Sequence, residues 1–336
     1  MNAVQKNDIN AFVQGFELSE QLTRKKFLVT GATGLIGSTL VRCLLSMNRG
    51  IEITIPVRSK AKAATIFGEN ESLHIVECDL VNWIRNLDES FDYVIHCASP
   101  TAGKYMVEHP VETYELAIES TKALLNYGRM KSVKSLVYVS SLESYGQIMD
   151  DHMISETDQG YIDIFSSRSS YPMGKRAAEY LCFAYSSEYD VPIKIARLTQ
   201  TFGAGVAVDD SRVFAQFARS VIGNSDIVMH TKGESAKPYC YTTDCISAIL
   251  YILLKGANGE AYNVANPSTY ISIRGLAEFL CENFNPQIKV VVKENLEMGY
   301  APVTKLNLSV EKLLSLGWRP RYNLREMFSR LIDSMR

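Results

Sequence analysis

The sequence lacks the residue clusters that hold disulfides and metals. Its seven cysteines are scattered and form no Cys-x-x-Cys pair, and its five histidines are isolated. An odd number of scattered cysteines is not the framework of a disulfide-stapled secreted domain, so we expect reduced thiols in a cytoplasmic protein. The same scatter predicts that no metal takes part in the chemistry.

Long apolar runs and an excess of charge of one sign are also missing. The longest largely apolar run, residues 246–254, is too short to cross a bilayer, and no apolar segment follows Lys6 as it would in a secretory leader. The formal net charge is −2 and 21% of residues are charged, so we expect neither nucleic-acid nor membrane partners. The 336 residues, 46% of them hydrophobic, suffice for one large domain or two smaller ones.

The clearest motif lies in residues 27–45, which read as an apolar strand, three glycines spaced three apart, and an amphipathic helix. In dinucleotide-binding folds one glycine makes the turn, one lets the backbone approach the pyrophosphate, and one lets the helix pack on the strand. The helix N-terminus then binds the anion. The spacing is Gly-x-x-Gly-x-x-Gly, and without its strand and helix it would indicate only a turn. We predict cofactor contacts from Gly31, Thr33, Gly34, Leu35, Ile36 and Gly37.

Strands alternate with helices through the first two hundred residues. This alternation predicts an α/β fold, a Rossmann-type doubly wound parallel sheet with helices on both faces. The rhythm becomes irregular after residue 202, which indicates a smaller C-terminal substrate lobe interleaved with the sheet. We expect an N-terminal extension at 1–24, a nucleotide-binding domain at 25–200 and the lobe at 201–336. A short helix at 8–16 is expected to serve packing or a dimer edge.

Arg58 and Lys60 follow the second expected strand, 52–57, whose end reads the adenosine ribose in this fold. An acid there accepts from the 2′-hydroxyl of NAD, whereas an arginine accommodates the 2′-phosphate of NADP. No acid follows the strand directly, and a guanidinium can grip a phosphate with paired hydrogen bonds. The alternative is a pair of solvated surface cations. We expect NADP(H) to be preferred, with NAD(H) possible.

Tyr171 and Lys175 stand four residues apart, so a helix would place them on one face. A neighbouring ammonium lowers the pKa of a phenol and lets it act as acid or base near neutral pH. Ser141 is expected at the carboxyl end of a strand, where open parallel sheets bind ligands and where its hydroxyl can polarise a reacting carbonyl. Tyr-x-x-x-Lys alone is a common surface pair. It gains weight here from the glycine motif and from Ser141.

Several further segments, together with these motifs, match the sequence motifs of a known family. They are residues 30–37, Asp79-Leu80, residues 96–99, Ser140-Ser141, Tyr171 with Lys175, Arg197, residues 239–244 and residues 262–265. Together they make the chain resemble the extended short-chain dehydrogenase/reductases, NAD(P)-dependent enzymes of nucleotide-sugar chemistry, over about residues 25–333. The resemblance implies that Ser141, Tyr171 and Lys175 are catalytic and that Lys175 also binds the nicotinamide ribose. It implies further cofactor contacts from Asp79 and Leu80 at the adenine, and from Cys97, Ala98, Ser99 and Leu198.

The chain departs from the family at substrate positions. The 4,6-dehydratases carry Asp-Glu after the catalytic Ser/Thr, but this chain has Leu142-Glu143, so the acid that protonates a departing hydroxyl is lost. Glu143 matches the catalytic glutamate of the nucleotide-sugar decarboxylases. Their phosphate-gripping arginine is replaced by Lys237, and their substrate-holding asparagine by Gln200.

Three hypotheses follow. Because net reductases of the family more often carry an arginine at the position of Arg58, we first expect an NADPH-dependent reductase of a keto group on a nucleotide-linked sugar or ketose, serving cell-surface polysaccharide precursors. The alternative is an epimerase or decarboxylase that recycles bound NAD, which Glu143 supports. The third is a non-catalytic NADP-binding sensor. By resemblance we also expect a homodimer, for which the apolar residues Leu116, Leu124, Leu125, Ala178, Leu181, Cys182 and Tyr185 are compatible with either an interface or ordinary packing.

Overall fold

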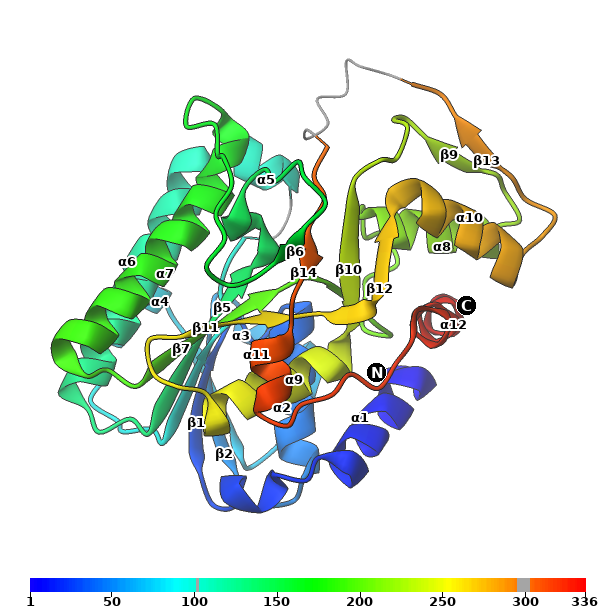
Figure 1. The fold of residues 1–336 in the computed structure, drawn as a ribbon. Coiled ribbons are helices and arrows are strands. Elements are labelled where there is room, and N and C mark those ends of the chain that lie inside the picture. The colour runs from blue at the N-terminus through cyan, green and yellow to red at the C-terminus, as the bar shows by residue number, and fades with distance from the viewer. Residues whose placement is uncertain (101–102, 295–302) are drawn as a thin grey trace.

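The computed structural model describes residues 1–100, 103–294 and 303–336. Its centre is a seven-stranded sheet in which every pairing is parallel, in the order β11-β7-β5-β4-β1-β2-β3 (Figure 1). The chain order reverses between β1 and β4, the place where such sheets bind ligands. The predicted Rossmann-type fold is confirmed. The strands are β1 (Lys26–Thr30), β2 (Glu52–Val57), β3 (Leu73–Glu77), β4 (Tyr93–His96), β5 (Ser135–Ser141), β7 (Ile193–Leu198) and β11 (Ala261–Val264).

Helices cover both faces of this sheet, which is why its strands read as continuous apolar runs. In β1, Phe27 and Val29 face the core under α2 (Leu35–Ser46) and α9 (Thr242–Lys255). Leu28, between them, faces the opposite core, under α6 (Pro110–Met130) and α7 (Ser170–Tyr189). The remaining helices of this part are α3 (Lys60–Phe67), α4 (Leu80–Arg85), α5 (Gly103–Glu108) and α11 (Glu311–Ser315).

The C-terminal lobe has a core of its own. The ring of Phe202 lies 4.7 Å from that of Phe214 and 4.8 Å from that of Phe328, measured between centroids. The lobe is not one continuous segment, because α9 and β11 return to the main sheet between its strands. Its elements are β8 (Gln200–Phe202), α8 (Val213–Ile222), β9 (Ile227–Met229), β10 (Ala236–Tyr241), β12 (Asn266–Ser272), α10 (Ile273–Phe284), β13 (Val290–Val292) and α12 (Leu324–Met335).

The N-terminal extension folds onto the body of the protein. Helix α1 (Ala3–Gly15) buries Ile9 and Phe12 and contacts α2, α9 and α12, and a short 3-10 turn, η1 (Ser19–Leu22), leads to β1. Figure 1 shows the two chain ends side by side, α1 next to α12. The expected helix at 8–16 therefore begins five residues earlier, at Ala3, where Asn2 caps it.

The polar stretch 147–170 contains a short strand, β6 (Met153–Ile154), which pairs with β14 (Asn307–Leu308), and a 3-10 turn, η3 (Ser167–Ser169).

Most of the apolar residues weighed as a dimer interface take part in ordinary packing between α6, α7 and the sheet. Leu124, Leu125, Ala178 and Cys182 are buried there, and Leu181 and Tyr185 pack against them.

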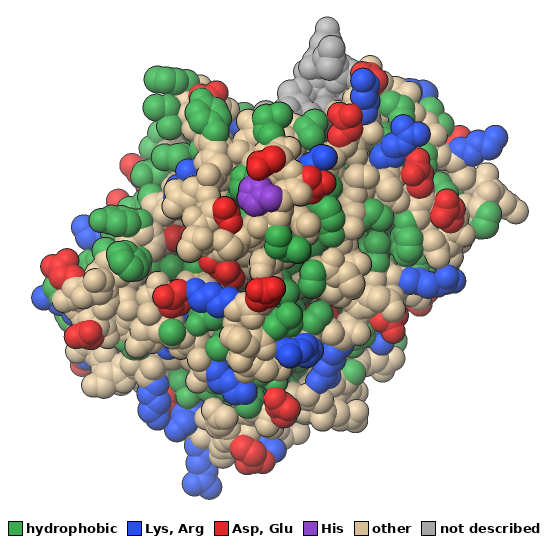
Figure 2. All heavy atoms as spheres, viewed as in Figure 1, with side chains coloured by type: hydrophobic (Ala, Val, Ile, Leu, Met, Phe, Trp, Pro, Cys, Tyr) green, Lys and Arg blue, Asp and Glu red, His purple; other side chains and the backbone are tan. Residues whose placement is uncertain are grey.

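Two searches cover the part of the chain that the structure describes. Within it no helix combines the length and apolarity needed to cross a bilayer, and no three His, Cys, Asp or Glu side chains gather as a metal site would require. On the face drawn in Figure 2, acidic and basic side chains are intermixed, and neither sign dominates.

Candidate active site

The glycine turn leaves the N-terminus of α2 open. Gly31 has a φ of +68°, and a Cβ there would lie 2.6 Å from the backbone nitrogen of Ala98. A Cβ on Gly37 would lie 2.4 Å from the carbonyl oxygen of Gly31. At Gly34, the N-cap residue, a Cβ would meet only that oxygen, at 3.4 Å, and no side chain caps the helix. Gly31 therefore makes the tight turn, Gly37 allows close packing, and Gly34 leaves the helix end open. This arrangement fits a dinucleotide pyrophosphate.

A network of buried polar side chains holds the segment after β4 beside this turn. Thr30 Oγ1 lies 2.6 Å from His96 Nδ1 and accepts from the backbone nitrogen of Ala98 at 3.3 Å. His96 Nε2 lies 3.0 Å from Ser120 Oγ. Burial, with Lys175 nearby, lowers the pKa of His96 to about 3, so the ring is neutral and its role is structural. Among the described residues, the buried hydroxyl of Ser99 lacks a hydrogen-bond partner, as a cofactor-lining group would before its ligand binds.

Cys97 lies in the same segment and is not a nucleophile. Burial raises the pKa of its thiol to about 12, with Lys175 opposing, so the thiol stays protonated. Asp79 and Leu80 follow β3, where the carboxylate of Asp79 accepts from the backbone nitrogen of Asn82 at 3.0 Å and caps α4.

The ribose end of the predicted cofactor site has an acid that the sequence did not reveal. Arg58 follows β2 and is exposed, and Lys60 is the first residue of α3. The backbone nitrogen of Lys60 donates to the carboxylate of Glu77, at 2.6 Å. Glu77 ends the neighbouring strand and is in register with Val57, the last residue of β2. Both an acid and a cation are therefore present at this position.

Ser141, Tyr171 and Lys175 come together as predicted, from the end of β5 and the first turns of α7. The ammonium of Lys175 donates to the carbonyl oxygen of Val139 at 2.9 Å and lies 5.6 Å from the centroid of the Tyr171 ring. Burial lowers the pKa of Lys175 to about 8.

The sequence suggested that Lys175 lowers the pKa of Tyr171, but in the structure this pKa is raised. Burial raises the pKa of Tyr171, and the carboxylate of Glu143 raises it further, while the hydroxyl of Ser141 and the guanidinium of Arg168 oppose the rise. Because desolvation dominates, burial favours the neutral phenol, which can donate a proton, and taking a proton would require the ionised phenol.

A buried ion pair fixes α7 against the sheet below these groups. The guanidinium of Arg197, on β7, donates to both carboxylate oxygens of Glu179, the shortest contact being 2.7 Å. Ser140 Oγ donates to the same carboxylate at 2.5 Å. Because Glu179 lies one turn after Lys175, this network sets the position of the catalytic face of α7 relative to β5. Leu198 is in register with Ser141, which places it at the same sheet edge.

A charged cluster borders Ser141 and Tyr171 on the lobe side. Glu143, in the 3-10 turn η2 (Leu142–Tyr145), pairs with Arg168, whose Nη2 lies 3.2 Å from its Oε2. Lys237, on β10, lies near both charged groups. Burial lowers its pKa, Glu143 opposes this change, and Arg168 adds to it. Sequence reasoning missed Arg168. Its position three residues before Tyr171, at the start of the helix, is the signal that was available.

The other two substrate-side residues differ in role. Gln200, on β8, is partly buried and in register with Tyr239 of β10. Leu142 is buried in a small core with Tyr145 and Ile148, so its side chain does not line the site. This placement agrees with the loss of dehydratase chemistry inferred from the sequence.

Comparisons with known proteins identify the family of the chain. Residues 27–265 match the model of the NAD dependent epimerase/dehydratase family. UDP-glucuronic acid decarboxylase 3 of Arabidopsis thaliana is 27% identical over 305 residues, covering 90% of this chain and 86% of that protein. UDP-glucuronic acid decarboxylase 1 of Xenopus tropicalis is 25% identical, covering 95% and 74%.

Solved structures share the fold. UDP-glucose 4-epimerase of Thermotoga maritima has a TM-score of 0.79 at 21% identity, with 92% of this chain and 98% of that chain covered. UDP-glucuronic acid 4-epimerase of Bacillus cereus, in complex with UDP-glucuronic acid and NAD, has a TM-score of 0.78 at 20% identity, with the same coverage.

Proposed function

Because the chain belongs to the NAD-dependent epimerase/dehydratase family, we propose that it is a decarboxylase of a nucleotide-linked hexuronic acid that recycles bound NAD(H). The relatives described above are decarboxylases and epimerases. They favour the recycling hypothesis over the NADPH-dependent reductase that Arg58 had suggested. The presence of Ser141, Tyr171 and Lys175 in one cluster disfavours the non-catalytic sensor.

The observation that carries the proposal is the charged cluster at the substrate side of Tyr171. A uronic acid and its diphosphate are anionic, and Arg168 and Lys237 supply two cations beside the catalytic tyrosine. Arginine binds a carboxylate with paired hydrogen bonds, and lysine binds it as a point charge. Glu143 holds Arg168 in place and gives the site the glutamate that the resemblance assigns to decarboxylases.

The chemistry divides between these residues. The ionised form of Tyr171 would take the proton of a ring hydroxyl and later return it, and Ser141 would hold that oxygen by a hydrogen bond. Lys175, on the next turn of α7, would orient Tyr171 and favour its ionised form. The chemistry that a bound nicotinamide would supply is the reversible transfer of one hydride. A ketone β to a carboxylate allows the carbon–carboxylate bond to break, so that CO₂ leaves and its electron pair becomes an enolate. Protonation of the carbon that lost CO₂ then converts the enolate back to the ketone, which is reduced in the last step.

The cofactor we propose is NAD(H). Glu77 offers a carboxylate at the end of β2, where an acid accepts from the ribose 2′-hydroxyl and repels a 2′-phosphate. Arg58 makes NADP(H) the competing choice. We also propose a homodimer in the cytoplasm, with a nucleotide-linked small molecule as substrate.

The test is an assay of the purified protein with UDP-glucuronic acid and other nucleotide-linked uronic acids, with no added cofactor. We expect CO₂ release and a product lighter by CO₂, with no net change in the absorbance of reduced nicotinamide. A product of unchanged mass and altered ring stereochemistry would instead identify an epimerase. Stoichiometric consumption of NADPH by keto-sugar substrates would restore the reductase hypothesis.

A further inference from the structure

Helix α1 is tied to the loop that follows β8. The side chain of Asn2 accepts from the backbone nitrogen of Gln5 at 2.8 Å, and the side chain of Gln5 accepts from the backbone nitrogen of Asn2 at 3.0 Å. The same Asn2 donates to the carbonyl oxygen of Ala204 at 3.0 Å. The capping box that starts the helix therefore also fixes residues 203–206 of the lobe.

Asp8 anchors α1 at its middle. It is 4% exposed, its Oδ2 accepts from the Tyr241 hydroxyl at 2.5 Å, and its Oδ1 accepts from Arg330 Nη1 at 2.5 Å. Tyr241 ends β10, and Arg330 lies on α12. A buried carboxylate that loses such partners is strongly penalised, so Asp8 holds α1 in a single position.

Gly205 is the point at which α1 meets the predicted cofactor site. A Cβ on Gly205 would lie 2.9 Å from the Gln5 side-chain nitrogen and 3.1 Å from Cδ1 of Leu35. Leu35 is the first residue of α2, at the open helix end where the pyrophosphate is expected, and its side chain also packs on the lobe core. Residues 203–206 are therefore held between α1 and the glycine turn.

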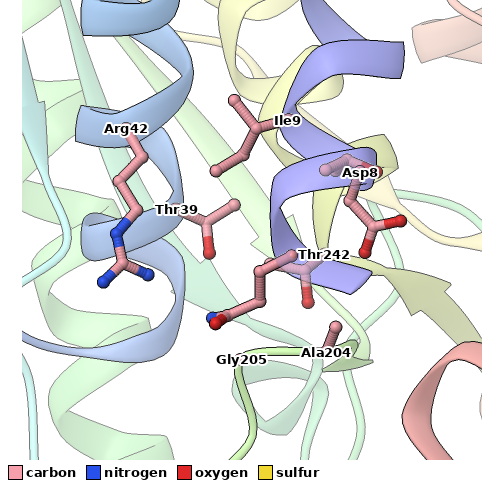
Figure 3. A pocket seen from close by; sticks show the side chains of 9 residues that line it. Asp8, Ile9, Thr39, Arg42, Ala204, Gly205 and Thr242 are labelled. Carbon is pink, nitrogen blue, oxygen red and sulfur yellow. The ribbon is translucent and has the colours of Figure 1, made fainter. Parts of the chain in front are cut away.

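The contact between α1 and its neighbours has a polar part beside its apolar packing. Figure 3 shows Ile9 on the side of α1 toward α2, which carries Thr39 and Arg42, and Asp8 on the other side of α1, with Ala204 and Gly205 at one edge of a pocket. The pocket is small, with a cavity volume of about 20 Å³. The hydroxyl of Thr242, another lining residue, is buried without a partner among the described residues. Directional bonds therefore add to the apolar packing of Ile9 and Phe12 in fixing α1.

We propose that α1 retains the dinucleotide between the two hydride transfers by holding residues 203–206 against Leu35. Gln5 and Asp8 are then positioning residues that act through this segment and do not touch the substrate. The proposal rests on the recycled cofactor of the proposed function, since an enzyme that recycles its cofactor must not release the reduced form halfway. It gives the N-terminal extension a role in catalysis.

The first experiment measures the dissociation rate of NADH by fluorescence, together with the dinucleotide that co-purifies, in Asp8→Ala and in a matched control, Asn7→Ala. Asn7 is the exposed neighbour of Asp8 on the same helix. We expect release to be at least about tenfold faster in Asp8→Ala, as for other segments that gate a bound ligand, and unchanged in Asn7→Ala. Equal release rates in Asp8→Ala and the wild type would overturn the proposal.

A second pair of variants separates retention from loss of folding. Gly205→Ala places a methyl group against Gln5 and Leu35, so we expect faster NADH release with a thermal midpoint close to that of the wild type. Gly275→Ala, on α10, is the matched control: its methyl group would also meet a side chain, that of Ile271 at 3.1 Å, and it should release NADH at the wild-type rate. If Gly205→Ala releases NADH at the wild-type rate, α1 does not act through this segment.

These outcomes are independent of the decarboxylase assay. A protein that consumes NADPH stoichiometrically would defeat the proposed function, yet α1-dependent release could still be measured with NADPH. If the protein is a decarboxylase but NADH release is the same in all of these variants, the proposed function stands and the proposed role of α1 is refuted.

Discussion

Arg168 and Glu143, 25 residues apart in the chain, form an ion pair at the edge of the catalytic cluster, with Nη2 3.2 Å from Oε2. Their side chains are 43% and 37% exposed. A pair so open to water contributes little to stability, so its value lies in orienting two charges beside Tyr171.

Replacing Glu143 with Gln should therefore impair turnover and spare the fold. We expect kcat to fall by roughly 100-fold, in the range typical of a lost charged group in an active site. Nucleotide-sugar and NADH binding, followed by titration, should change far less. Glu278→Gln removes a comparably exposed ion pair, with Arg274 at 2.9 Å, and should leave kcat unchanged. Equal losses in both variants would assign Glu143 a structural role.

Tyr171→Phe should abolish chemistry while leaving the cofactor bound. Because the phenol oxygen of Tyr171 carries the proton, we expect kcat to drop by at least about 1000-fold, with NADH affinity within a few-fold of the wild type. Steady-state assays and fluorescence titration provide the two measurements. Tyr161→Phe, at an exposed position outside the catalytic cluster, is the control and should behave as the wild type. Substantial activity in Tyr171→Phe would mean that another group moves the proton.

The choice between NAD and NADP depends on Glu77 and Arg58. We expect tighter binding of NADH than of NADPH by about tenfold or more, since a carboxylate near a phosphate is repulsive. Glu77→Gln should narrow the difference, and Arg58→Ala should weaken NADPH alone. Titration of the three proteins with both nucleotides is the measurement. A preference for NADPH that Arg58→Asp abolishes would return the cofactor assignment to NADP.

Asp244 should make stability depend on pH in an unusual direction. Burial raises its pKa to about 6, although the backbone nitrogens of Arg321 and Tyr322 donate to it. The folded protein therefore holds this proton more tightly than the unfolded chain, so the stabilising contribution is full below about pH 4 and is lost as pH rises through 6. At neutral pH the cost is up to roughly 3 kcal/mol.

Comparison with Asp244→Asn isolates this effect. Urea unfolding at acidic and neutral pH should show the wild type losing free energy of unfolding relative to the variant as pH rises. Asp209→Asn, at an exposed position, should follow the wild type at both pH values. A constant difference between wild type and Asp244→Asn across this range would contradict the raised pKa.

The proposed dimer would use the outer side of α6 and α7. Val111, Tyr180 and Phe183 are 61%, 68% and 55% exposed there, an apolar grouping typical of an interface. We expect wild-type protein to have the mass of two chains in solution and Phe183→Glu to have the mass of one. Phe165→Glu, on a loop outside these helices, should remain dimeric. A wild-type monomer would remove the prediction.

Local patterns were enough to predict most of the fold. The strand at 52–57 has the predicted bounds, because it is an apolar segment with clear ends. The serine, tyrosine and lysine of the site could be found because two share a helix face and one ends a strand.

The features that could not be predicted from the sequence depend on contacts between segments far apart in the chain or on burial. Glu77 reaches the end of β2 only because β3 lies beside it, and no pattern after β2 shows this. Asp8 finds Tyr241 and Arg330 across more than two hundred residues. The elevated pKa of Tyr171 arises from burial, which Tyr-x-x-x-Lys spacing cannot express.

The burial of Leu142 limits how this enzyme could change its reaction. Its side chain packs with Tyr145, Ile148, Ile154 and Leu308, so it joins the catalytic turn to a core built from distant strands. An aspartate at 142 would not gain dehydratase chemistry, because it would place a carboxylate in that core at a cost of several kcal/mol. A lineage moving toward dehydration would have to rebuild this core before the acid could be used, which makes the reaction type hard to switch by single mutations.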